Sequence, residues 1–561
     1  MRSLVTGLAL LAVLVLGGGA EAGPSPATAA AEHGMVVSSQ HLASMVGAGI
    51  LAAGGNAVDA AVAVGYALAV VEPCCGNIGG GGFMTIHLAD GRDTFINFRE
   101  TAPAAARPGL FLDPAGNPVA ERSRRGYLAA GVPGTVMGLD RAAREYGTLP
   151  RAALMAPAIA LARDGFVLTR DDTDLLDAKA ALFAHDPAAA KIFLRADGSR
   201  WAPGDRLVQS DLAHTLAAIA RNGPDAFYNG AVARSVAAAS RAHGGVMTAH
   251  DFAAYTATEG PPLTCFYRGF VVVTAPPPSS GGTTLCEILN ILEGYDLARL
   301  GFLTPPMIEH VVAAMARAYA DRNAFLGDPA FVANPLDRLL SKGYAAGVRA
   351  AIAAGAFAPP PPAGGPHERA ETTHYSVADA AGNAVAVTYT INGYFGAGVV
   401  APGTGFLLNN EMDDFTVKPG APNLFGLEQG AANLVAGGKR PLSSMAPSLI
   451  EKDGQVILAL GSPGGPRIIT TVLETLLDII DYRMSAAAAV AAPRFHYQDR
   501  PQIVFYERGG FSADTIASLT EHGYTVAAQH PWGAVELIAA DHNRLYGVGD
   551  GRRRGGAAIG Y

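Results

Sequence analysis

Residues 356–371 restrict how this chain can fold more than any other segment, because four consecutive prolines at 359–362 lie within them. Proline lacks the backbone N–H that helices and central strands need, so this stretch predicts an exposed linker. Residues 372–377 then begin a pattern of β-forming residues, and a turn at Gly382 leads into a second strand at 384–392. The sequence therefore predicts a flexible segment that runs directly into a β-hairpin.

The second strand of this hairpin has one apolar face and one polar face, because side chains alternate along a strand. The apolar face carries Val385, Val387, Tyr389 and Ile391, and the polar face carries Thr388, Thr390 and Asn392. A strand buried on both sides usually has two apolar faces. The polar row therefore indicates either contact with solvent or a functional site, and spacing alone favours solvent.

The first half of the chain predicts helices around a glycine-rich turn. Apolar residues indicate helices at 41–52 and 56–71, and Ala-rich helices are expected from about 135 to 255. The glycine run at 76–82 follows a helix rather than a strand, which argues against a nucleotide-binding loop. It is better explained by close backbone packing. A β-hairpin is expected over 83–98.

A second glycine-rich segment, 461–466, precedes a predicted helix at 467–480. Pro466 suits the first helical position, where a missing N–H costs little. The glycines allow backbone N–H groups to point at one spot near the helix N-terminus, a geometry that suits an anion or an oxyanion. An ordinary glycine turn into a helix explains the segment equally well.

The composition is typical of a large folded protein. The chain has 561 residues, of which 50% are hydrophobic and 16% charged, and its formal net charge is -8. A chain of this length is expected to form two to four domains. The modest charge and the lack of a long Lys/Arg run argue against nucleic acid as a partner.

The N-terminus predicts an exported protein. Arg2 precedes an apolar run at 4–16, and the small residues around 20–22 fit a cleavage site, so residues 1–22 are interpreted as a signal peptide. The apolar run is shorter than the roughly 20 residues that span a bilayer. We therefore expect a periplasmic or secreted protein without a membrane span.

The four cysteines are Cys74, Cys75, Cys265 and Cys286. Export permits disulfides, and the adjacent pair could bond to the other two, but sequence does not fix the connectivity. The chain has neither CxxC spacing nor an HExxH pattern, so no metal site is expected.

A series of motifs runs through most of the chain after the signal peptide. In order they are FRETAP (98–103), GVPG (131–134), PPPSSGG (276–282), TTHYS (372–376), LNNEMDDF (408–415), KRPLSSM (439–445) and GSPGG (461–465). Together they resemble the γ-glutamyltransferase family of the N-terminal-nucleophile hydrolases.

The resemblance implies an α/β (α+β) fold, the four-layer αββα sandwich of that superfamily, and a precursor that cleaves itself. Cleavage between Glu371 and Thr372 would give a large subunit of residues 23–371 and a small subunit of 372–561. The two subunits would stay together as a heterodimer. No metal or organic cofactor is implied.

The resemblance also implies catalytic roles. Thr372 would be the nucleophile, and the α-amine freed by cleavage would act as its base. Thr390 would hydrogen-bond and position the nucleophile. Gly464 and Gly465 would form the oxyanion hole through their backbone N–H groups.

The remaining implied residues bind the amino acid head group of the substrate. An α-carboxylate needs cations and hydrogen-bond donors, whereas an α-ammonium needs carboxylates and other acceptors. The α-carboxylate is assigned to Arg99, Ser443 and Ser444, and the α-ammonium to Asn392, Glu411 and Asp414.

The implied activity is hydrolysis of glutathione and its conjugates, with transfer of the γ-glutamyl group to water or to an amino acid or peptide. A cephalosporin (glutaryl) acylase of the same fold is an alternative, against which Arg99 and Asp414 argue. An inactive secreted binding protein is another, against which intact Thr372 and Thr390 argue. The sequence departs from many bacterial relatives at Phe425, where they carry a tyrosine in the loop over the site.

Overall fold

The computed structural model of the chain describes residues 25–355, 372–541 and 544–561. The predicted signal peptide at 1–22 and the predicted linker at 356–371, which includes Glu371, lie outside these residues. Within the described ranges, no helix has both the length and the apolar character needed to cross a membrane.

Two seven-stranded sheets form the centre of the protein, and within each sheet all neighbouring strands are antiparallel. The first sheet contains, in order, β19 (Ala557–Gly560), β2 (Gly34–Ser38), β10 (Thr373–Asp379), β11 (Ala384–Thr390), β3 (Gly81–His87), β4 (Asp93–Asn97) and β7 (Thr258–Gly260). The second sheet contains β1 (Ala27–Ala31), β18 (Arg544–Gly549), β17 (Glu536–Asp541), β13 (Gln455–Leu460), β12 (Ser448–Lys452), β9 (Phe270–Thr274) and β8 (Leu263–Tyr267). Two small sheets contain β14 (Phe495–His496), β15 (Val504–Glu507) and β16 (Val526–Gln529), and β5 (Phe166–Val167) with β6 (Arg206–Leu207).

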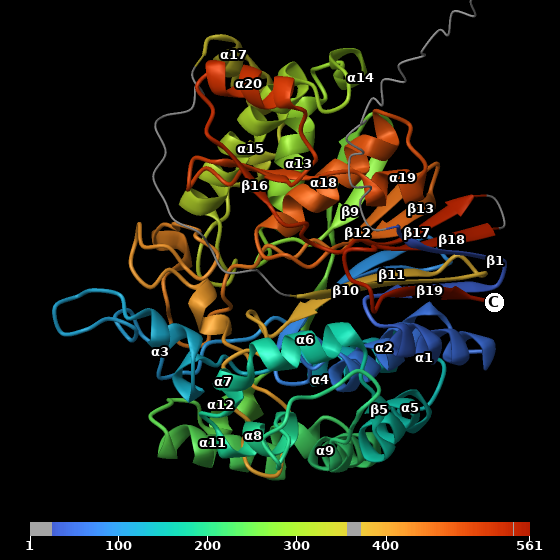
Figure 1. Cartoon of the computed structure of the whole chain (residues 1–561), viewed down its shortest axis with the longest axis vertical. Coiled ribbons are helices and arrows are strands. Elements are labelled where there is room, and N and C mark those ends of the chain that lie inside the picture. The colour runs from blue at the N-terminus through green and yellow to red at the C-terminus, as the bar shows by residue number, and fades with distance from the viewer. Residues whose placement is uncertain (1–24, 356–371, 542–543) are drawn as a thin grey trace, which may run out of the picture.

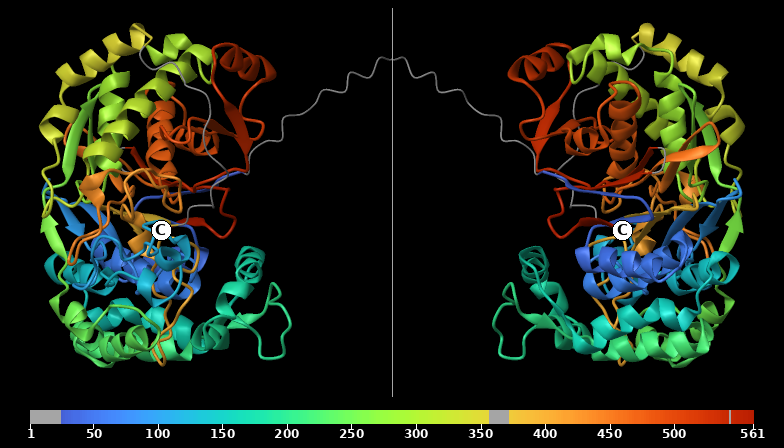
Figure 2. Two further views of the ribbon diagram at one scale, coloured as in Figure 1. Left: turned by 90° about the vertical axis from the view of Figure 1, so that its left-hand side faces the viewer. Right: turned by 90° about the vertical axis from the view of Figure 1, so that its right-hand side faces the viewer.

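Helices cover the outer faces of the paired sheets (Figure 1, Figure 2). On the side of the first sheet lie α1 (His41–Ala52), α2 (Ala57–Val71), α3 (Ala120–Arg124), α4 (Thr135–Tyr146), α5 (Arg151–Asp164), α6 (Arg170–Ala178), α7 (Ala180–Phe183), α8 (Pro187–Phe193), α9 (Ser210–Asn222), α10 (Asp225–Tyr228), α11 (Ala231–Ala242) and α12 (Ala249–Ala254). On the side of the second sheet lie α13 (Gly281–Leu292), α14 (Leu297–Leu300), α15 (Pro305–Phe325), α16 (Leu336–Leu339), α17 (Lys342–Ala353), α18 (Arg467–Ile480), α19 (Ala486–Ala491) and α20 (Ala513–Glu521). Three short 3₁₀ helices among the described residues are η1 (Tyr127–Ala129), η2 (Glu411–Asp414) and η3 (Ala431–Asn433).

The layers are held together by separate apolar cores. In β2, Val36 packs into the core beneath α1 and α2, whereas Met35 and Val37 pack between the two sheets. This alternation follows from the twofold side-chain period of a strand that is buried on both faces. Ala386 of β11 and Leu449 of β12 also lie in the core between the sheets. The predicted αββα sandwich is therefore confirmed.

Most predicted elements are present close to their expected bounds. The helix expected from residue 56 begins at Ala57, because the Asn56 side chain caps it and accepts a hydrogen bond from the Asp59 N–H at 2.9 Å. Pro466 was expected to be the first helical residue, but α18 begins one residue later and Pro466 is its N-cap. The backbone turn that leads into α18 begins at the glycines, because the Gly464 carbonyl accepts a hydrogen bond from the Arg467 N–H.

The disulfides join Cys74 to Cys75 and Cys265 to Cys286. The possibility that the adjacent pair bonds to the other two cysteines is therefore wrong. Cys265 on β8 and Cys286 on α13 share the core outside the second sheet, whereas Cys74 and Cys75 follow α2 in the core outside the first sheet. The two sheets separate the pairs.

The glycine run at 76–82 brings backbone against backbone, as predicted. A Cβ added to Gly79 would lie 2.0 Å from the Leu407 carbonyl oxygen, and a Cβ on Gly80 would lie 2.0 Å from the carbonyl oxygen of Thr390. These positions leave no space for any side chain, and Gly80 thereby fixes the end of β11.

We expect Gly80→Ala to lower the free energy of unfolding by about 3 kcal/mol or more, because neither backbone can move without breaking the sheet. Gly347→Ala is the matched control, since Gly347 lies within α17 and has no atom within 4 Å of an added Cβ. That substitution should stabilise by about 0.5–1 kcal/mol through lower chain entropy. Urea unfolding of both variants tests this, and equal midpoints would contradict it.

Candidate active site

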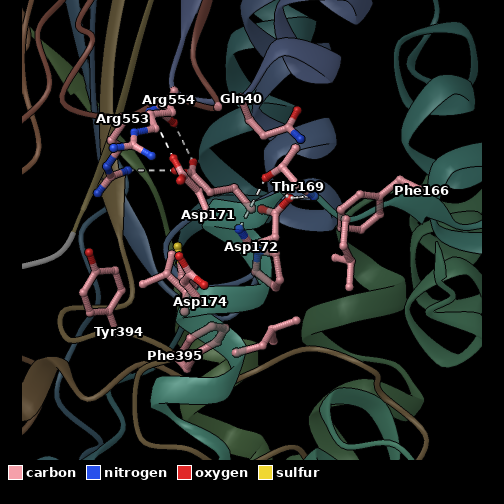
Figure 3. Close-up of a pocket in the computed structure, with 18 of the residues that line it drawn as sticks. Gln40, Phe166, Thr169, Asp171, Asp172, Asp174, Tyr394, Phe395, Arg553 and Arg554 are labelled. Carbon is pink, nitrogen blue, oxygen red and sulfur yellow. Dashed lines mark hydrogen bonds and ion pairs between the residues drawn. The ribbon is translucent and has the colours of Figure 1, made fainter. Parts of the chain in front are cut away.

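Two hollows lie on either side of the start of β10. One is a small pocket lined by Arg99, Arg322, Thr372, Thr390, Asn392, Glu411, Asp414, Phe425, Leu427, Leu442, Ser443, Ser444, Met445, Gly465 and Ile468. The other is larger and is lined by residues of α6, the segment after α2 and the segment before β19 (Figure 3). The small pocket gathers almost all of the predicted site residues, so it is the candidate active site.

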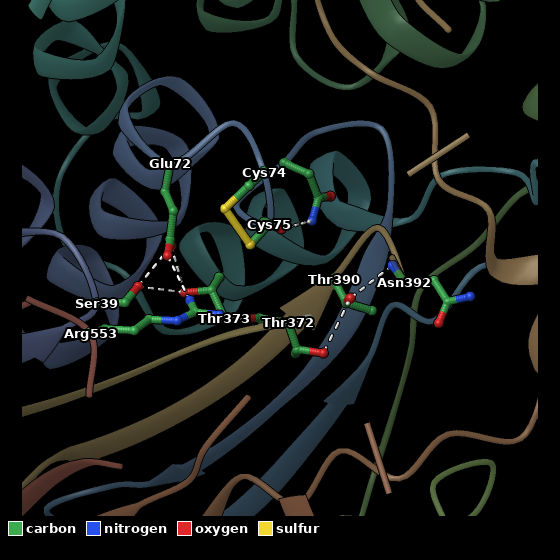
Figure 4. The surroundings of a disulfide bond; sticks show 10 residues. Ser39, Glu72, Cys74, Cys75, Thr372, Thr373, Thr390, Asn392 and Arg553 are labelled. Atoms are coloured by element: carbon green, nitrogen blue, oxygen red, sulfur yellow. Dashed lines mark hydrogen bonds and ion pairs between the residues drawn. A yellow bond between two sulfur atoms is a disulfide. The ribbon is translucent and has the colours of Figure 1, made fainter. Parts of the chain in front are cut away.

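Thr372 lies immediately before β10 and is 4% exposed. Its hydroxyl donates to the Thr390 hydroxyl oxygen at 3.4 Å, and the Asn392 backbone N–H donates to the same oxygen at 2.8 Å (Figure 4). The Thr372 carbonyl accepts a hydrogen bond from the Arg553 guanidinium at 2.9 Å. These contacts orient the Thr372 hydroxyl into the pocket.

The polar row on β11 faces this site and the neighbouring interior. Thr388 is fully buried and bonds to His374 at 2.8 Å, while Thr390 and Asn392 are each only 3% exposed. The interpretation of this row as solvent-facing, which spacing alone favours, is therefore wrong. The second sheet covers the polar face of β11, which the pattern of one strand cannot reveal.

Gly464 and Gly465 connect β13 to α18 and have φ angles of 136° and 55°. L-residues with side chains rarely adopt these conformations, which explains glycine at both positions. Gly465 lines the pocket together with Thr372. The location at a helix N-terminus is compatible with the predicted oxyanion hole.

Arg99 is fully buried at the bottom of the pocket in a cluster of carboxylates. Its guanidinium bonds to Glu411 and, at 2.5 Å, to Asp414, and it lies 3.5 Å from Glu100. Burial would lower the pKa of Arg99, but the three carboxylates outweigh it and raise this pKa. Burial raises the pKa of Glu411, and raises that of Glu100 to about 7, although Arg99 opposes both shifts.

The predicted head-group residues are thus brought together, but their partners differ from the expectation. Arg99 was expected to bind an α-carboxylate, and Glu411 and Asp414 an α-ammonium. In the structure the three side chains form ion pairs with one another. Arg99 offsets only part of the buried negative charge, because both carboxylate oxygens of Glu100 and one of Glu411 are buried without a hydrogen-bond partner among the described residues.

Arg322 on α15 is a second buried guanidinium in the pocket, and the sequence analysis missed it. It donates to Ser280 Oγ at 2.9 Å and to Ser444 Oγ at 3.1 Å. It also donates to the Gln429 side-chain oxygen at 3.2 Å. No carboxylate of the described residues lies within ion-pair distance of it, and burial lowers its pKa to about 10. A residue inside a long helix carries no motif that would have pointed to it.

Ser443 and Ser444 are held in place by the segment before α13. The Ser280 N–H and hydroxyl both donate to the Ser443 carbonyl, at 2.7 and 2.5 Å. The Ser279 hydroxyl donates to the Met445 carbonyl at 2.5 Å. The PPPSSGG and KRPLSSM motifs therefore contact each other, and this contact directs the side chains of Ser443 and Ser444 toward the pocket.

Phe425 covers the pocket and is 6% exposed. Its loop is fixed to the acidic segment, because the Leu424 N–H donates to Asp413 at 2.6 Å and the Asn423 amide donates to Asp414 at 3.3 Å. Gln498 donates to the Phe425 carbonyl at 3.1 Å. The predicted lid position of this loop agrees with these contacts.

A second polar group that the sequence analysis missed lies behind Thr372. Glu72 accepts hydrogen bonds from Ser39 and Thr373, both at 2.7 Å, and pairs with Arg553 at 2.7 Å. Burial raises the pKa of Glu72, and the Arg553 charge opposes that shift. These residues lie at 39, 72, 373 and 553, so only the folded chain brings them together.

The fold has two stacked antiparallel sheets between helical layers, and a threonine hydroxyl lies at the start of a central strand. This combination defines the class of N-terminal-nucleophile hydrolases. The family model described as Gamma-glutamyltranspeptidase matches residues 43–560. The chain belongs to the γ-glutamyltranspeptidase family.

Individual relatives agree with this membership. The chain is 50% identical to a glutathione hydrolase proenzyme of Pseudomonas sp. (strain A14), with 96% of each chain covered. It is 46% identical to that of Escherichia coli (strain K12), with 95% of this chain and 92% of the relative covered. Among solved structures, the cephalosporin acylase from Bacillus halodurans matches with a TM-score of 0.85 and 28% identity, covering 95% of this chain and 97% of that one.

The two buried arginines should differ in their contribution to stability. We expect Arg99→Met to lower the free energy of unfolding by about 3–5 kcal/mol, since it leaves buried carboxylates without their cation. Arg322→Met should cost only about 1–3 kcal/mol, because its partners are neutral.

The loss in Arg99→Met should also grow with pH. Burial raises the carboxylate pKa values in the folded state, so stability is kept while these groups are protonated and is lost as pH rises through those values. Urea unfolding of both variants from about pH 5 to about pH 8 measures this. An equal, pH-independent loss in the two variants would contradict the assignment.

Proposed function

We propose that this protein is an exported γ-glutamyltransferase and glutathione hydrolase that matures by cleaving itself before Thr372. Maturation would yield a large subunit of residues 23–371 and a small subunit of 372–561. The observation that carries the proposal is that Thr372 lines one pocket together with Arg99, Glu411 and Asp414, which form a buried ion-pair cluster. The predicted signal peptide at 1–22 supports a periplasmic or secreted location.

Cleavage supplies the catalytic base. Once the peptide bond between Glu371 and Thr372 is broken, Thr372 has a free α-amine with an ordinary pKa of about 7.7–8.0. That amine can accept the proton of the residue's own hydroxyl near neutral pH. Thr390 holds the hydroxyl oxygen in position, and Arg553 holds the carbonyl of the same residue.

Acyl transfer then proceeds in two halves. Thr372 Oγ1 attacks the γ-carbonyl carbon, and the negative charge that develops on the carbonyl oxygen is stabilised by N–H groups of Gly464 and Gly465. The C–N bond breaks, the leaving amine takes the proton from the Thr372 amine, and a γ-glutamyl ester remains. Water or the amine of an amino acid or peptide attacks this ester and restores the Thr372 hydroxyl.

The charged cluster favours an amino acid head group. When an α-carboxylate binds Arg99, an α-ammonium can replace the guanidinium as the partner of Glu411 and Asp414. No buried charge then loses its partner. A glutaryl group brings the carboxylate without the ammonium, and an unpaired buried charge costs about 3–5 kcal/mol.

The charges of the pocket separate this function from its alternatives. Similarity in fold to a cephalosporin acylase is strong, but the carboxylates favour γ-glutamyl compounds over glutaryl ones. An inactive binding protein would not need the Thr372, Thr390 and Gly465 constellation in one pocket.

The first expected outcome concerns maturation. Purified wild type should give two chains, the smaller beginning at Thr372, because this residue serves both cleavage and catalysis. Thr372→Ala should stay a single chain without activity. Gel electrophoresis with N-terminal sequencing tests this, and cleavage of Thr372→Ala at the same bond would falsify the assignment.

The second concerns selectivity. Asp414→Asn removes a partner of the ammonium, and a loss of 3–5 kcal/mol corresponds to at least about a 100-fold lower kcat/KM on γ-glutamyl anilide. Activity on glutaryl anilide should not fall, since that compound has no ammonium. Parallel losses on both substrates would show that Asp414 supports the fold rather than the head group.

The third concerns the lid. Phe425 retains the ring of the tyrosine found in many bacterial relatives but has no hydroxyl. We expect Phe425→Tyr to raise the ratio of transfer to hydrolysis several-fold, because a new hydrogen bond of about 0.5–1.5 kcal/mol to a residue such as Asn392, which follows β11, favours the closed lid and excludes water. Partitioning of one γ-glutamyl donor between water and glycylglycine measures it. An unchanged or lower ratio would rule out the latch, leaving the nucleophile assignment intact.

A further inference from the structure

Cys74 and Cys75 form a disulfide between adjacent residues in the turn after α2 (Figure 4). Both side chains are almost fully buried, at 4% and 1% exposure. Cys74 nevertheless belongs to the lining of the larger hollow, whereas Cys75 does not. A small molecule in that hollow would therefore contact Cys74 rather than Cys75.

The hollow offers charges of both signs and an aromatic wall. Asp171 of α6 accepts a hydrogen bond from the Arg554 backbone N–H beside Arg553, and Asp174 of α6 lies in the part of the hollow that Tyr394 and Phe395 line (Figure 3). Such a lining fits a small zwitterionic molecule, with its carboxylate near the arginines and its ammonium near the aspartates. The Glu72 carboxylate lies within 4.8 Å of both sulfurs, and the Arg553 guanidinium pairs with that carboxylate at 2.7 Å.

The disulfide turn connects to the nucleophile through a short chain of hydrogen bonds. The N–H groups of Cys75 and Gly76 donate to the Glu72 carbonyl at 3.0 and 2.9 Å. The Glu72 carboxylate holds Thr373 and Arg553, and Arg553 holds the Thr372 carbonyl. Any change in this turn therefore reaches Thr372 through Glu72.

We propose that Cys74–Cys75 is a thiol–disulfide exchange site for small zwitterionic thiols of the cysteinyl-peptide type. The thiolate attacks Cys74 Sγ, the Cys74–Cys75 bond breaks, and Cys75 leaves as a thiolate that takes up a proton. A second thiolate then attacks the bound thiol's sulfur and releases Cys74. Two small thiols are oxidised to one disulfide, and the protein disulfide is reduced to two thiols, so electrons balance.

The exchange reaction does not require the proposed transferase activity. The state of the disulfide would nevertheless regulate the rate of that activity. Opening the disulfide releases the turn that positions Glu72, so Thr372 is held less firmly. The turnover number kcat should fall several-fold on reduction, whereas KM should change little, because Arg99 and Asp414 lie outside this chain of contacts.

Thiol mapping of the wild-type protein is the first test. The folded protein is incubated with cysteinylglycine and a chelator, alkylated with iodoacetamide, and its peptides are analysed by mass spectrometry. Cys74 and Cys75 should be alkylated while Cys265 and Cys286 stay protected, because the latter pair lies in a core without a lining role in the hollow. Protection of Cys74 and Cys75, or equal labelling of both pairs, would overturn the proposal.

Trapping identifies the attacked sulfur. Cys75→Ser leaves Cys74 as a thiol, which should attack cysteinylglycine disulfide and retain one cysteinylglycine as a mixed disulfide. Cys74→Ser is the matched control and should retain none, since Cys75 does not line the hollow. Equal adducts in the two variants, or an adduct only on Cys75, would contradict the assignment.

Kinetics test the connection to Thr372. Wild type and a Cys265→Ser/Cys286→Ser double variant should both lose kcat on reduction by cysteinylglycine, with KM unchanged. A Cys74→Ser/Cys75→Ser double variant should have the lower kcat from the start and show no response. A Cys74→Ser/Cys75→Ser double variant with wild-type kcat would exclude regulation. Adduct mapping is a separate readout, because it detects exchange even if the protein has no transferase activity.

Discussion

The antiparallel register of β10 and β11 is the constraint on which the rest of the site depends. Thr373 pairs with Tyr389, so Thr372 is placed beside Thr390 at the open end of the hairpin. Gly80 packs against the Thr390 backbone and fixes that end from the neighbouring segment. A shift of one residue would turn every side chain to the other face, and the Thr372 hydroxyl would point away from the pocket.

The fold also buries one arginine among three carboxylates at this pocket. Arg99 contacts all three carboxylates, and burial raises the pKa of Glu100 and of Glu411, which favours their neutral forms. Arg322 instead bonds neutral oxygens and holds the Ser444 hydroxyl in place. We propose that Arg99 exchanges its partners with a zwitterionic substrate, while Arg322 secures the serine segment.

Local sequence patterns predicted the helices, the hairpins and the close packing of glycines, because each depends on neighbouring residues. Resemblance to a family predicted the layers of the fold and the catalytic and head-group residues. Of these predicted residues, the pocket contains every one except Gly464. Patterns could not predict the burial of the polar row on β11, which the second sheet covers. Nor could they predict Arg322, the Glu72 group or the cysteine pairing, since these depend on segments far apart in the chain.

The central claim is that Thr372 carries the acyl group at the start of a chain. The most direct measurement is to mix the protein with a γ-glutamyl donor, quench it in acid and map its peptides by mass spectrometry. We expect one γ-glutamyl group on the hydroxyl of an N-terminal peptide that begins at Thr372. An adduct on any other residue, or on a Thr372 still joined to Glu371, would contradict it.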